Sequence, residues 1–325
     1  MTVRWTWHGG GLDAARAHFG GEDWIDLSTG INPHAWPGAA ATSIDWRCLP
    51  DERALRNLET AAADHFGCGA DHLCAVPGTE AGLRLIGSML PGPAFHLSPA
   101  YRTHGEMVEG SVPIPKHRLD EADGSSLILA NPNNPDGHVL DRDTLLGFLE
   151  RRGREGWLLV DEAFADCHAA YSLATHVEDG RRLLLFRSFG KFFGLAGVRL
   201  GFVIGPSAFI GEVRRRLGAW PVSAAAIAIG TAAYRDTGWI AGMRARLGRE
   251  ADELDSVLRA SGFDPQGACP LFRLIDCGDA MDLFDRLAKR AILTRPFDHD
   301  PGWLRIGLPG TGESLARLQQ ALRDG

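Results

Sequence analysis

The sequence lacks an excess of positive charge. Its 325 residues include 34 lysines and arginines against 41 aspartates and glutamates, which gives a net charge of −7. Proteins that bind nucleic acids or membrane surfaces usually carry basic patches, so this balance argues against both kinds of partner. The charge alone says nothing about the fold.

The sequence also lacks an apolar run long enough to cross a membrane, which takes about 20 residues. The longest weakly polar stretch, 220–234, is interrupted by Pro221, Ser223 and Gly230. The first eight residues contain no apolar core of a signal peptide and no small-residue cleavage site. We therefore expect a cytoplasmic protein that does not enter a membrane.

Cysteine spacing gives no sign of a metal site or of a disulfide framework. Six cysteines occur, and no two of them form a C-x-x-C pair. Internal repeats and low-complexity tracts are absent as well. We expect six reduced thiols and no bound metal.

Short apolar runs alternate with segments of helical periodicity through the first two thirds of the chain. The apolar runs predict buried strands over 73–76, 94–97, 126–130, 157–161, 183–188 and 200–204. The periodic segments between them predict helices over 79–90, 142–152 and 206–217. This alternation predicts an α/β fold with a mostly parallel sheet between helices, whose ligands bind beyond the carboxyl ends of the strands.

The pattern changes after about residue 220. Long helical segments and two isolated strand patterns there predict a smaller α+β domain, with helices over 223–236, 240–261, 280–290 and 314–323 and strands over 272–276 and 303–307. The first 35 residues are rich in glycine and tryptophan and show little periodicity. We therefore predict an N-terminal arm over 1–35, a large domain over 36–220 and a small C-terminal domain over 221–325.

The segment Ser-Phe-Gly-Lys-Phe-Phe-Gly-Leu-Ala-Gly-Val-Arg, which begins at Ser188, carries the strongest chemical signal. An isolated lysine in a loop is usually a solvated surface charge. Lys191, however, follows a predicted buried strand and lies between Gly190 and aromatic residues. Loss of water lowers a lysine's pKa, so its free amine can attack an aldehyde. Arg199, eight residues later, is suited to pair with a phosphate.

Three further motifs follow predicted strands. Asn134 lies in Asn-Pro-Asn-Asn-Pro-Asp-Gly, Asp161 ends a strand, and Gly78, Thr79 and Glu80 join a strand to a helix. Taken one at a time, these motifs read equally well as a turn, a helix cap and a common strand-to-helix connection. Their shared position at the carboxyl ends of strands predicts one ligand site.

In their order along the chain, these motifs resemble the fold-type I enzymes of the aspartate aminotransferase superfamily, which depend on pyridoxal 5′-phosphate (PLP). The resemblance covers nearly the whole chain and implies that Lys191 carries PLP as a Schiff base. It implies that Asp161 pairs with the ring nitrogen, that Asn134 contacts the ring hydroxyl and that Tyr101 stacks on the ring. The implied catalytic residues are Lys191, Asp161 and Tyr101. The residues implied to bind the cofactor phosphate are Gly78, Thr79, Glu80, Ser188 and Arg199. A homodimer is implied as well.

Two branches of this superfamily are most similar, the histidinol-phosphate aminotransferases and the threonine-phosphate decarboxylases of cobalamin biosynthesis. The start of the chain, with His8-Gly-Gly and Asp-Leu-Ser-Thr-Gly-Ile-Asn-Pro over 26–33, is similar to the decarboxylases. So is Phe164, which stands where aminotransferases usually have tyrosine. Leu49 replaces a tyrosine implied to reach the partner subunit's cofactor, and Gly190 replaces a hydroxyl residue. These two departures bear on the dimer contact and on the phosphate site.

The resemblance to the decarboxylases implies conversion of L-threonine O-3-phosphate to (R)-1-aminopropan-2-ol O-phosphate, with Lys191 returning a proton to Cα. Arginines suit the two anionic groups of this phosphorylated amino acid. The implied substrate-binding residues are His8, Gly30, Asn32, Asn134, Arg295 and Arg305. Two alternatives stay open. One is an aminotransferase of the histidinol-phosphate type, and the other is a non-catalytic binding protein with a PLP-enzyme fold.

Overall fold

The computed structural model describes residues 4–323, so the outermost residues of the predicted arm and of the predicted small domain lie outside the described residues. The chain packs as two compact units that alternate along the sequence. Unit 1 holds the residues up to His34, Pro135–His138 and those from Gly242 onward. Unit 2 holds Ala35–Asn134 and Val139–Ala241. The division near residue 241 lies about one helix beyond the boundary at 220 that the sequence pattern predicts.

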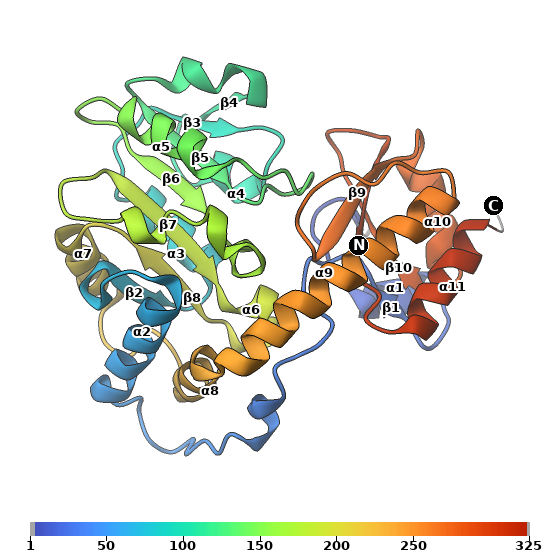
Figure 1. The fold of residues 1–325 in the computed structure, drawn as a ribbon, viewed down its shortest axis with the longest axis horizontal. Coiled ribbons are helices and arrows are strands. Elements are labelled where there is room, and N and C mark those ends of the chain that lie inside the picture. The colour runs from blue at the N-terminus through green and yellow to red at the C-terminus, as the bar shows by residue number, and fades with distance from the viewer. Residues whose placement is uncertain (1–3, 324–325) are drawn as a thin grey trace. The chain divides into compact units, whose positions relative to one another are not determined.

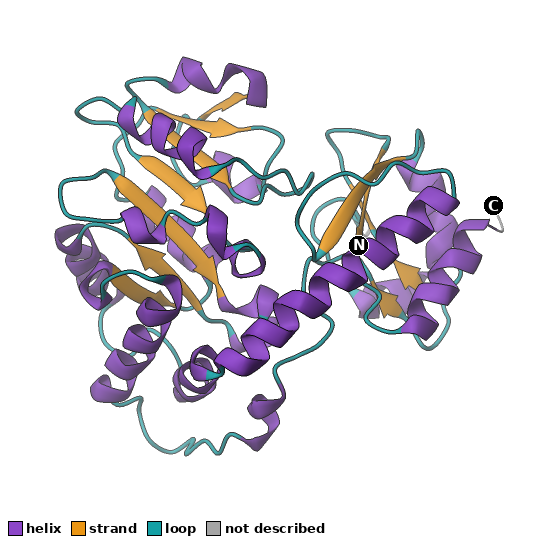
Figure 2. Cartoon of the chain, viewed as in Figure 1, coloured by secondary structure: helices purple, strands orange, loops and turns teal. Residues whose placement is uncertain are grey.

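Unit 2 is built on a seven-stranded sheet (Figure 2). From one edge to the other, its strands are β2 (Leu73–Val76), β8 (Gly201–Ile204), β7 (Leu183–Ser188), β6 (Leu158–Asp161), β5 (Ser126–Ala130), β3 (Ala94–Leu97) and β4 (Val112–Ile114). Strand β8 runs antiparallel to both neighbours, and every other neighbouring pair is parallel. The predicted mostly parallel α/β sheet is therefore confirmed. Its six predicted strands all form, and only β4 was not expected.

Helices cover both faces of this sheet (Figure 1). The α-helices of unit 2 are α2 (Glu52–Phe66), α3 (Thr79–Gly87), α4 (Arg102–Glu106), α5 (Arg142–Glu150), α6 (Phe189–Phe192), α7 (Ser207–Leu217) and α8 (Ala224–Arg235). On one face, Leu83 of α3 and Ile210 of α7 belong to a buried cluster with Leu159 and Leu184 of the sheet. The central strands are buried along their whole length, because apolar side chains on both faces pack against helices.

Helix α2 has no counterpart among the predicted helices, although both of its ends carry clear signals. The side chain of Asp51 caps the first turn by accepting a 2.9 Å hydrogen bond from the backbone N–H of Ala54. Gly67 ends the helix with φ of 76°, a left-handed conformation that glycine adopts without a steric penalty. Helix α8 packs against α2, so it belongs to unit 2.

Unit 1 combines the start and the end of the chain. Its elements are α1 (Leu12–Phe19), β1 (Ile25–Asp26), β9 (Phe272–Asp276), α10 (Ala280–Ala288), β10 (Ile292–Leu293), β11 (Arg295–Pro296), β12 (Trp303–Gly307) and α11 (Gly312–Arg323). Strands β11, β12 and β9 form an antiparallel sheet in that order, and β1 pairs with β10 in parallel. The N-terminal residues are thus tied to the C-terminal ones by strand pairing. Helix α9 (Thr237–Ala260) contains the division between the units.

No described helix is both long enough and apolar enough to span a bilayer. Among residues 4–323 there is also no cluster of three or more His, Cys, Asp or Glu side chains that could hold a metal ion.

Candidate active site

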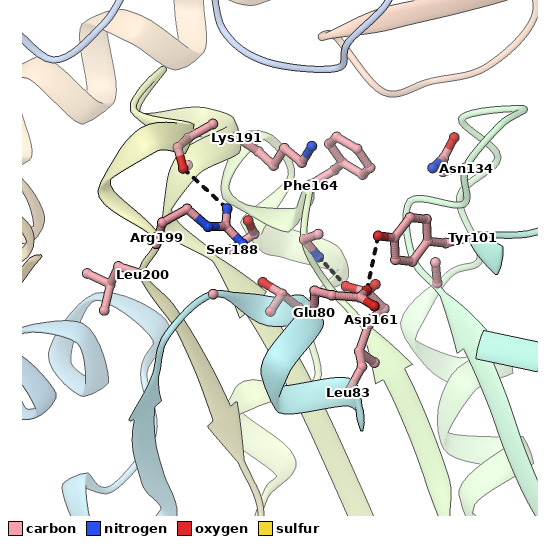
Figure 3. A pocket seen from close by; sticks show the side chains of 16 residues that line it. Glu80, Leu83, Tyr101, Asn134, Asp161, Phe164, Ser188, Lys191, Arg199 and Leu200 are labelled. Atoms are coloured by element: carbon pink, nitrogen blue, oxygen red, sulfur yellow. Dashed lines mark hydrogen bonds between the residues drawn. The ribbon is translucent and has the colours of Figure 1, made fainter. Parts of the chain in front are cut away.

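A cavity of about 160 Å³ opens in unit 2 where β5, β6 and β7 end (Figure 3). Ala130, Asp161 and Ser188, the last residues of these three strands, line it. The lining also includes every residue that the sequence predicts to bind a cofactor, namely Gly78, Thr79, Glu80, Tyr101, Asn134, Asp161, Ser188, Lys191 and Arg199. The predicted residues therefore meet at the carboxyl edge of a parallel sheet, where such sheets bind their ligands.

Asp161 is held in place by two contacts at the end of β6. One carboxylate oxygen, Oδ1, accepts a 3.0 Å hydrogen bond from the backbone N–H of Ala163. The other, Oδ2, lies 3.1 Å from Nε2 of His104, whose side chain is completely buried. A carboxylate fixed in this way on a cavity wall is suited to accept a hydrogen bond from a protonated ring nitrogen.

His104 is a residue of the site that the sequence analysis missed. It lies in α4, and its ring meets the ring of Tyr101 edge-on, with centroids 5.7 Å apart and planes at 80°. The spacing of three residues between Tyr101 and His104 was the only available signal, because it can bring two side chains to one face of a helical turn. That signal does not specify a contact with Asp161, which is 57 residues away in the sequence.

Lys191 extends from the single-turn helix α6 directly after β7. Its Nζ lies 5.6 Å from the centroid of the Phe164 ring. Figure 3 shows these two side chains. Phe164 lies three residues after Asp161, just beyond the end of β6. The ends of the adjacent strands β6 and β7 thus position both the acid, Asp161, and the amine, Lys191. The ring face attracts an ammonium group but, lacking a phenol hydroxyl, supplies no hydrogen bond at its tip.

Two glycines allow Arg199 and the backbone of β8 to lie close to the start of α3. A Cβ atom added to Gly78, which has φ of 91°, would lie 2.5 Å from the Arg199 guanidinium. A Cβ atom on Gly201 would lie 2.7 Å from the backbone nitrogen of Thr79. The first N–H groups of a helix have no partner within the helix and favour anions. Together with the guanidinium, these N–H groups form a set of donors that fits a phosphate group.

Close backbone packing explains why the residue before Lys191 is a glycine. A Cβ atom on Gly190 would lie 2.6 Å from the Cα atom of Ala196, in the short 3₁₀ turn η7 (Ala196–Val198). The close approach of these two backbone segments therefore excludes a larger residue at 190. The hydroxyl of Thr79 donates a 3.1 Å hydrogen bond to the backbone carbonyl of Arg187, which joins the start of α3 to β7.

A buried cluster of charges lies next to the cavity residues in the sequence. Arg187, one residue before Ser188, donates to Glu162 at 2.9 Å and to Asp166 at 2.5 Å. All three side chains are at most 2% exposed. Burial disfavours the charged forms, but the two carboxylates outweigh it for Arg187 and raise its pKa. Burial also opposes ionisation of Asp166, and Arg187 and His65 together lower its pKa well below the usual range.

The two arginines predicted to bind substrate lie together in unit 1. Arg295 of β11 pairs in antiparallel register with Arg305 of β12. Arg305 is 2% exposed and donates a 2.7 Å hydrogen bond to the backbone carbonyl of Ser28. Burial, and next the charge of Arg295, lower the pKa of Arg305. An anion beside this pair would offset the repulsion between the two cations.

The other predicted substrate residues of unit 1 come from its N-terminal segment. Gly30 and Asn32 are buried, and the Asn32 side chain accepts a 2.9 Å hydrogen bond from the backbone N–H of His34. His8 is exposed. The backbone N–H of Gly10 donates to the Ser28 hydroxyl at 2.7 Å, so the residues after His8 are tied to the segment that also contacts Arg305.

Residues 116–322 match the family described as aminotransferase class I and II. The chain belongs to this family. Among solved structures, it is similar to histidinol-phosphate aminotransferase from Sinorhizobium meliloti in complex with pyridoxal-5′-phosphate, with a TM-score of 0.86, 19% identity, and coverage of 97% of this chain and 94% of that one.

Within the family, the chain is similar to two proteins named threonine-phosphate decarboxylase. The one from Sinorhizobium sp is 38% identical over 97% of each chain. The one from Pseudomonas aeruginosa is 39% identical over 97% of this chain and 96% of the relative. A histidinol-phosphate aminotransferase from Bradyrhizobium diazoefficiens is 30% identical over 92% of each chain.

Proposed function

We propose that this chain catalyses the PLP-dependent decarboxylation of L-threonine O-3-phosphate to (R)-1-aminopropan-2-ol O-phosphate, a step of cobalamin biosynthesis. The observation that carries the proposal is the cavity in which Lys191, Asp161, Asn134 and Arg199 converge beside Phe164. The similarity to threonine-phosphate decarboxylases over almost the whole chain supports the choice of reaction.

The residues of the cavity fit PLP by their chemistry. The donors around Arg199 and the start of α3 suit the phosphate group, and the anchored carboxylate of Asp161 suits the ring nitrogen. The amine of Lys191 suits the aldehyde. When bound, PLP withdraws electrons from the Cα atom of an amino acid and weakens whichever bond stands perpendicular to its ring.

Each lining residue then has a defined task. Lys191 would hold the cofactor, and its Nζ would hold the proton that returns to Cα after CO₂ leaves. The Asp161 carboxylate would keep the ring nitrogen protonated, with His104 and the Ala163 N–H fixing the orientation of that carboxylate. Asn134 would contact the ring hydroxyl, and Tyr101 would pack on the ring. The residues that would bind the phosphate, through backbone and side-chain donors, are Gly78, Thr79, Glu80, Ser188 and Arg199.

The substrate anchors decide which bond of Cα stands perpendicular to the ring. Arg295 and Arg305 are suited to the carboxylate and phosphate of threonine phosphate, because guanidinium groups bind such anions through two parallel hydrogen bonds. His8, Gly30 and Asn32 are further contacts in this proposal. An aminotransferase removes the proton of Cα, whereas a decarboxylase releases the carboxylate, so these anchors would determine which of the two reactions occurs.

We also infer a cytoplasmic homodimer from the family resemblance. Trp46 and Leu49, in the loop before α2, expose 77% and 66% of their surface. Large exposed apolar side chains of this kind commonly mark a protein interface. Leu49 occupies the position at which the resemblance places a tyrosine that crosses to the partner subunit.

The test is an assay of CO₂ release from threonine O-phosphate by the purified chain supplied with PLP. We expect release by the wild type and none by Lys191→Ala, with 1-aminopropan-2-ol phosphate as the product. Transfer of the amino group to 2-oxoglutarate without CO₂ would favour the aminotransferase instead. A chain that binds PLP and transforms neither substrate would favour the non-catalytic binding protein.

The lysine itself can be identified independently of turnover. The chain contains only three lysines, Lys116, Lys191 and Lys289. Borohydride fixes PLP on the lysine that carries it, and peptide mapping then distinguishes the three. We expect the label on Lys191, and a label confined to Lys116 or Lys289 would contradict the proposal.

A further inference from the structure

One wall of the cavity carries a hydrogen-bonded group that the family resemblance does not assign. The hydroxyl of Tyr101 donates to Oε2 of Glu80 at 3.1 Å, a contact drawn as a dashed line in Figure 3. The hydroxyl of Thr103 donates to the same oxygen at 2.8 Å. The Glu80 side chain, at the start of α3, therefore holds both Tyr101, the residue before α4, and Thr103, in the first turn of α4.

The same carboxylate is held from behind. Arg84, one helical turn further along α3, donates to Oε1 of Glu80 at 2.7 Å. The guanidinium of Arg84 also donates to Glu106 of α4 at 2.7 Å. These contacts form a chain from Glu80 through Arg84 to Glu106 that joins α3 to α4. Glu106 is the outer end of this chain, and among the described residues it makes no hydrogen bond to Tyr101.

The charges fix the direction of the bond between Tyr101 and Glu80. Burial, and next the Glu80 carboxylate, raise the pKa of Tyr101 to about 12. Burial opposes ionisation of Glu80, but hydrogen bonds from Thr103, Arg84 and Tyr101 outweigh it and lower its pKa. Near neutral pH the phenol therefore keeps its proton and directs it to an ionised carboxylate.

This geometry constrains both the ring and the proton of Tyr101. The rotation of a tyrosine ring about its last torsion is only weakly restricted by its own chemistry. Here the hydroxyl is tethered at one end, and the edge of the ring rests against His104. The ring is thus held in one orientation on the cavity wall, and its only acidic proton is already engaged.

We propose that Glu80 is a positioning residue, which fixes the Tyr101 ring for stacking on the cofactor and excludes the Tyr101 hydroxyl from proton transfer at Cα. Proton transfer at Cα then falls to Lys191 alone. This inference rests on the proposed function, because it takes PLP to be the group on which Tyr101 stacks. It adds a side-chain role for Glu80 to the backbone role that the resemblance implies.

The test is a double-mutant cycle that combines Glu80→Ala with Tyr101→Phe. The measurement is the PLP dissociation constant, from titration of the near-violet absorbance of each apo-protein. We expect either single change to weaken binding about three- to tenfold, the size of one typical intramolecular hydrogen bond. The double variant should bind PLP no more weakly than the single variant with the larger dissociation constant, because both changes remove the same contact.

Two further variants keep the test independent of folding defects. Glu80→Gln retains an acceptor of nearly the same shape and should restore most of the lost affinity. Glu106→Gln changes the outer end of the contact chain and should alter the dissociation constant less than twofold. Thermal unfolding of each apo-protein shows whether a loss of affinity reflects a loss of fold.

The pH profile of CO₂ release separates positioning from proton transfer. Tyr101→Phe should leave the pH limits of kcat unchanged. Losses that multiply in the double variant, or a shifted pH limit in Tyr101→Phe, would overturn this inference while leaving the proposed function intact. A wild-type chain that binds no PLP would overturn both.

Discussion

Two buried arginines, one in each unit, have opposite electrostatic settings. Arg187 in unit 2 lies between the carboxylates of Glu162 and Asp166, and these raise its pKa. Arg305 in unit 1 lies in register with Arg295, and burial together with that second cation lowers its pKa. Both side chains are 2% exposed, so burial alone does not distinguish them.

Under the proposed function, we expect the charge of Arg187 to stabilise the fold and the charge of Arg305 to bind a substrate anion. A guanidinium neutralised by two carboxylates gains little from a further anion, and its removal leaves the two acids buried without their partner. A guanidinium beside a second guanidinium gains most when an anion arrives. We therefore expect replacement of Arg187 to lower the stability of the fold and replacement of Arg305 to lower the activity.

The largest effect is expected for Arg187→Met. We expect the free energy of unfolding to fall by about 3–5 kcal/mol, because the change leaves Glu162 and Asp166 buried without the guanidinium. Urea denaturation of the apo-protein measures this loss. Arg181→Met, an exposed arginine six residues earlier, is the matched control and should stay within about 0.5 kcal/mol of the wild type. If the free energy of unfolding falls as little as in the control, Arg187 does not stabilise the fold and the contrast with Arg305 is wrong.

The next effect is expected for Arg305→Met, and it should appear in activity. Loss of a buried partner for a substrate anion costs about 2–4 kcal/mol, so kcat/KM should fall roughly 30- to 1,000-fold. Stability should change little, because the removed repulsion from Arg295 offsets the lost hydrogen bond to the Ser28 carbonyl. Arg249→Met, at an exposed position of α9, serves as the control for both measurements. If Arg305→Met unfolds as readily as Arg187→Met, the arginine is structural.

The smallest effect is a pH dependence that sharpens the role of Arg187. The depressed pKa of Asp166 contributes stability above the carboxyl pKa of the unfolded chain, about 4, and this contribution is lost as the pH falls below that value. In Arg187→Met the pKa of Asp166 should rise, so protonation relieves its burial at a higher pH. The stability gap between wild type and variant should therefore narrow by about 1 kcal/mol from pH 7 to pH 4. A constant gap, measured by urea denaturation, would show that Asp166 does not depend on Arg187.

Most of the large sheet could be predicted because its strands are buried on both faces and read as short apolar runs. The cavity could be predicted because its residues follow those strands directly, as Asp161 follows Val160 and Lys191 follows Ser188 after two residues. In both cases a local pattern fixes the position of each side chain, and the topology of a parallel sheet brings the ends together.

The remaining features depend on partners that are distant in the sequence. The pairing of Ile25 with Ile292 joins the N-terminal segment to the C-terminal part of the chain. The glycine-rich N-terminal segment has no periodicity from which this contact could be predicted. The contact of His104 with Asp161 joins residues 57 positions apart, and no local pattern predicts it. Helix α2 is different, because its cap at Asp51 and its end at Gly67 were visible in the sequence.

The proposed phosphate site is made largely of main chain. The N–H groups at the start of α3 lie against the backbone of β7 and β8, where a Cβ on Gly201 would meet the nitrogen of Thr79 and the carbonyl of Arg187. Main-chain groups are common to all residues, so substitutions that spare the glycines would leave this part of the site in place. Under the proposed function, an engineer who wishes to change the substrate of this scaffold would therefore begin with the arginine pair of unit 1. The cofactor site could then be kept while substrate preference is redesigned.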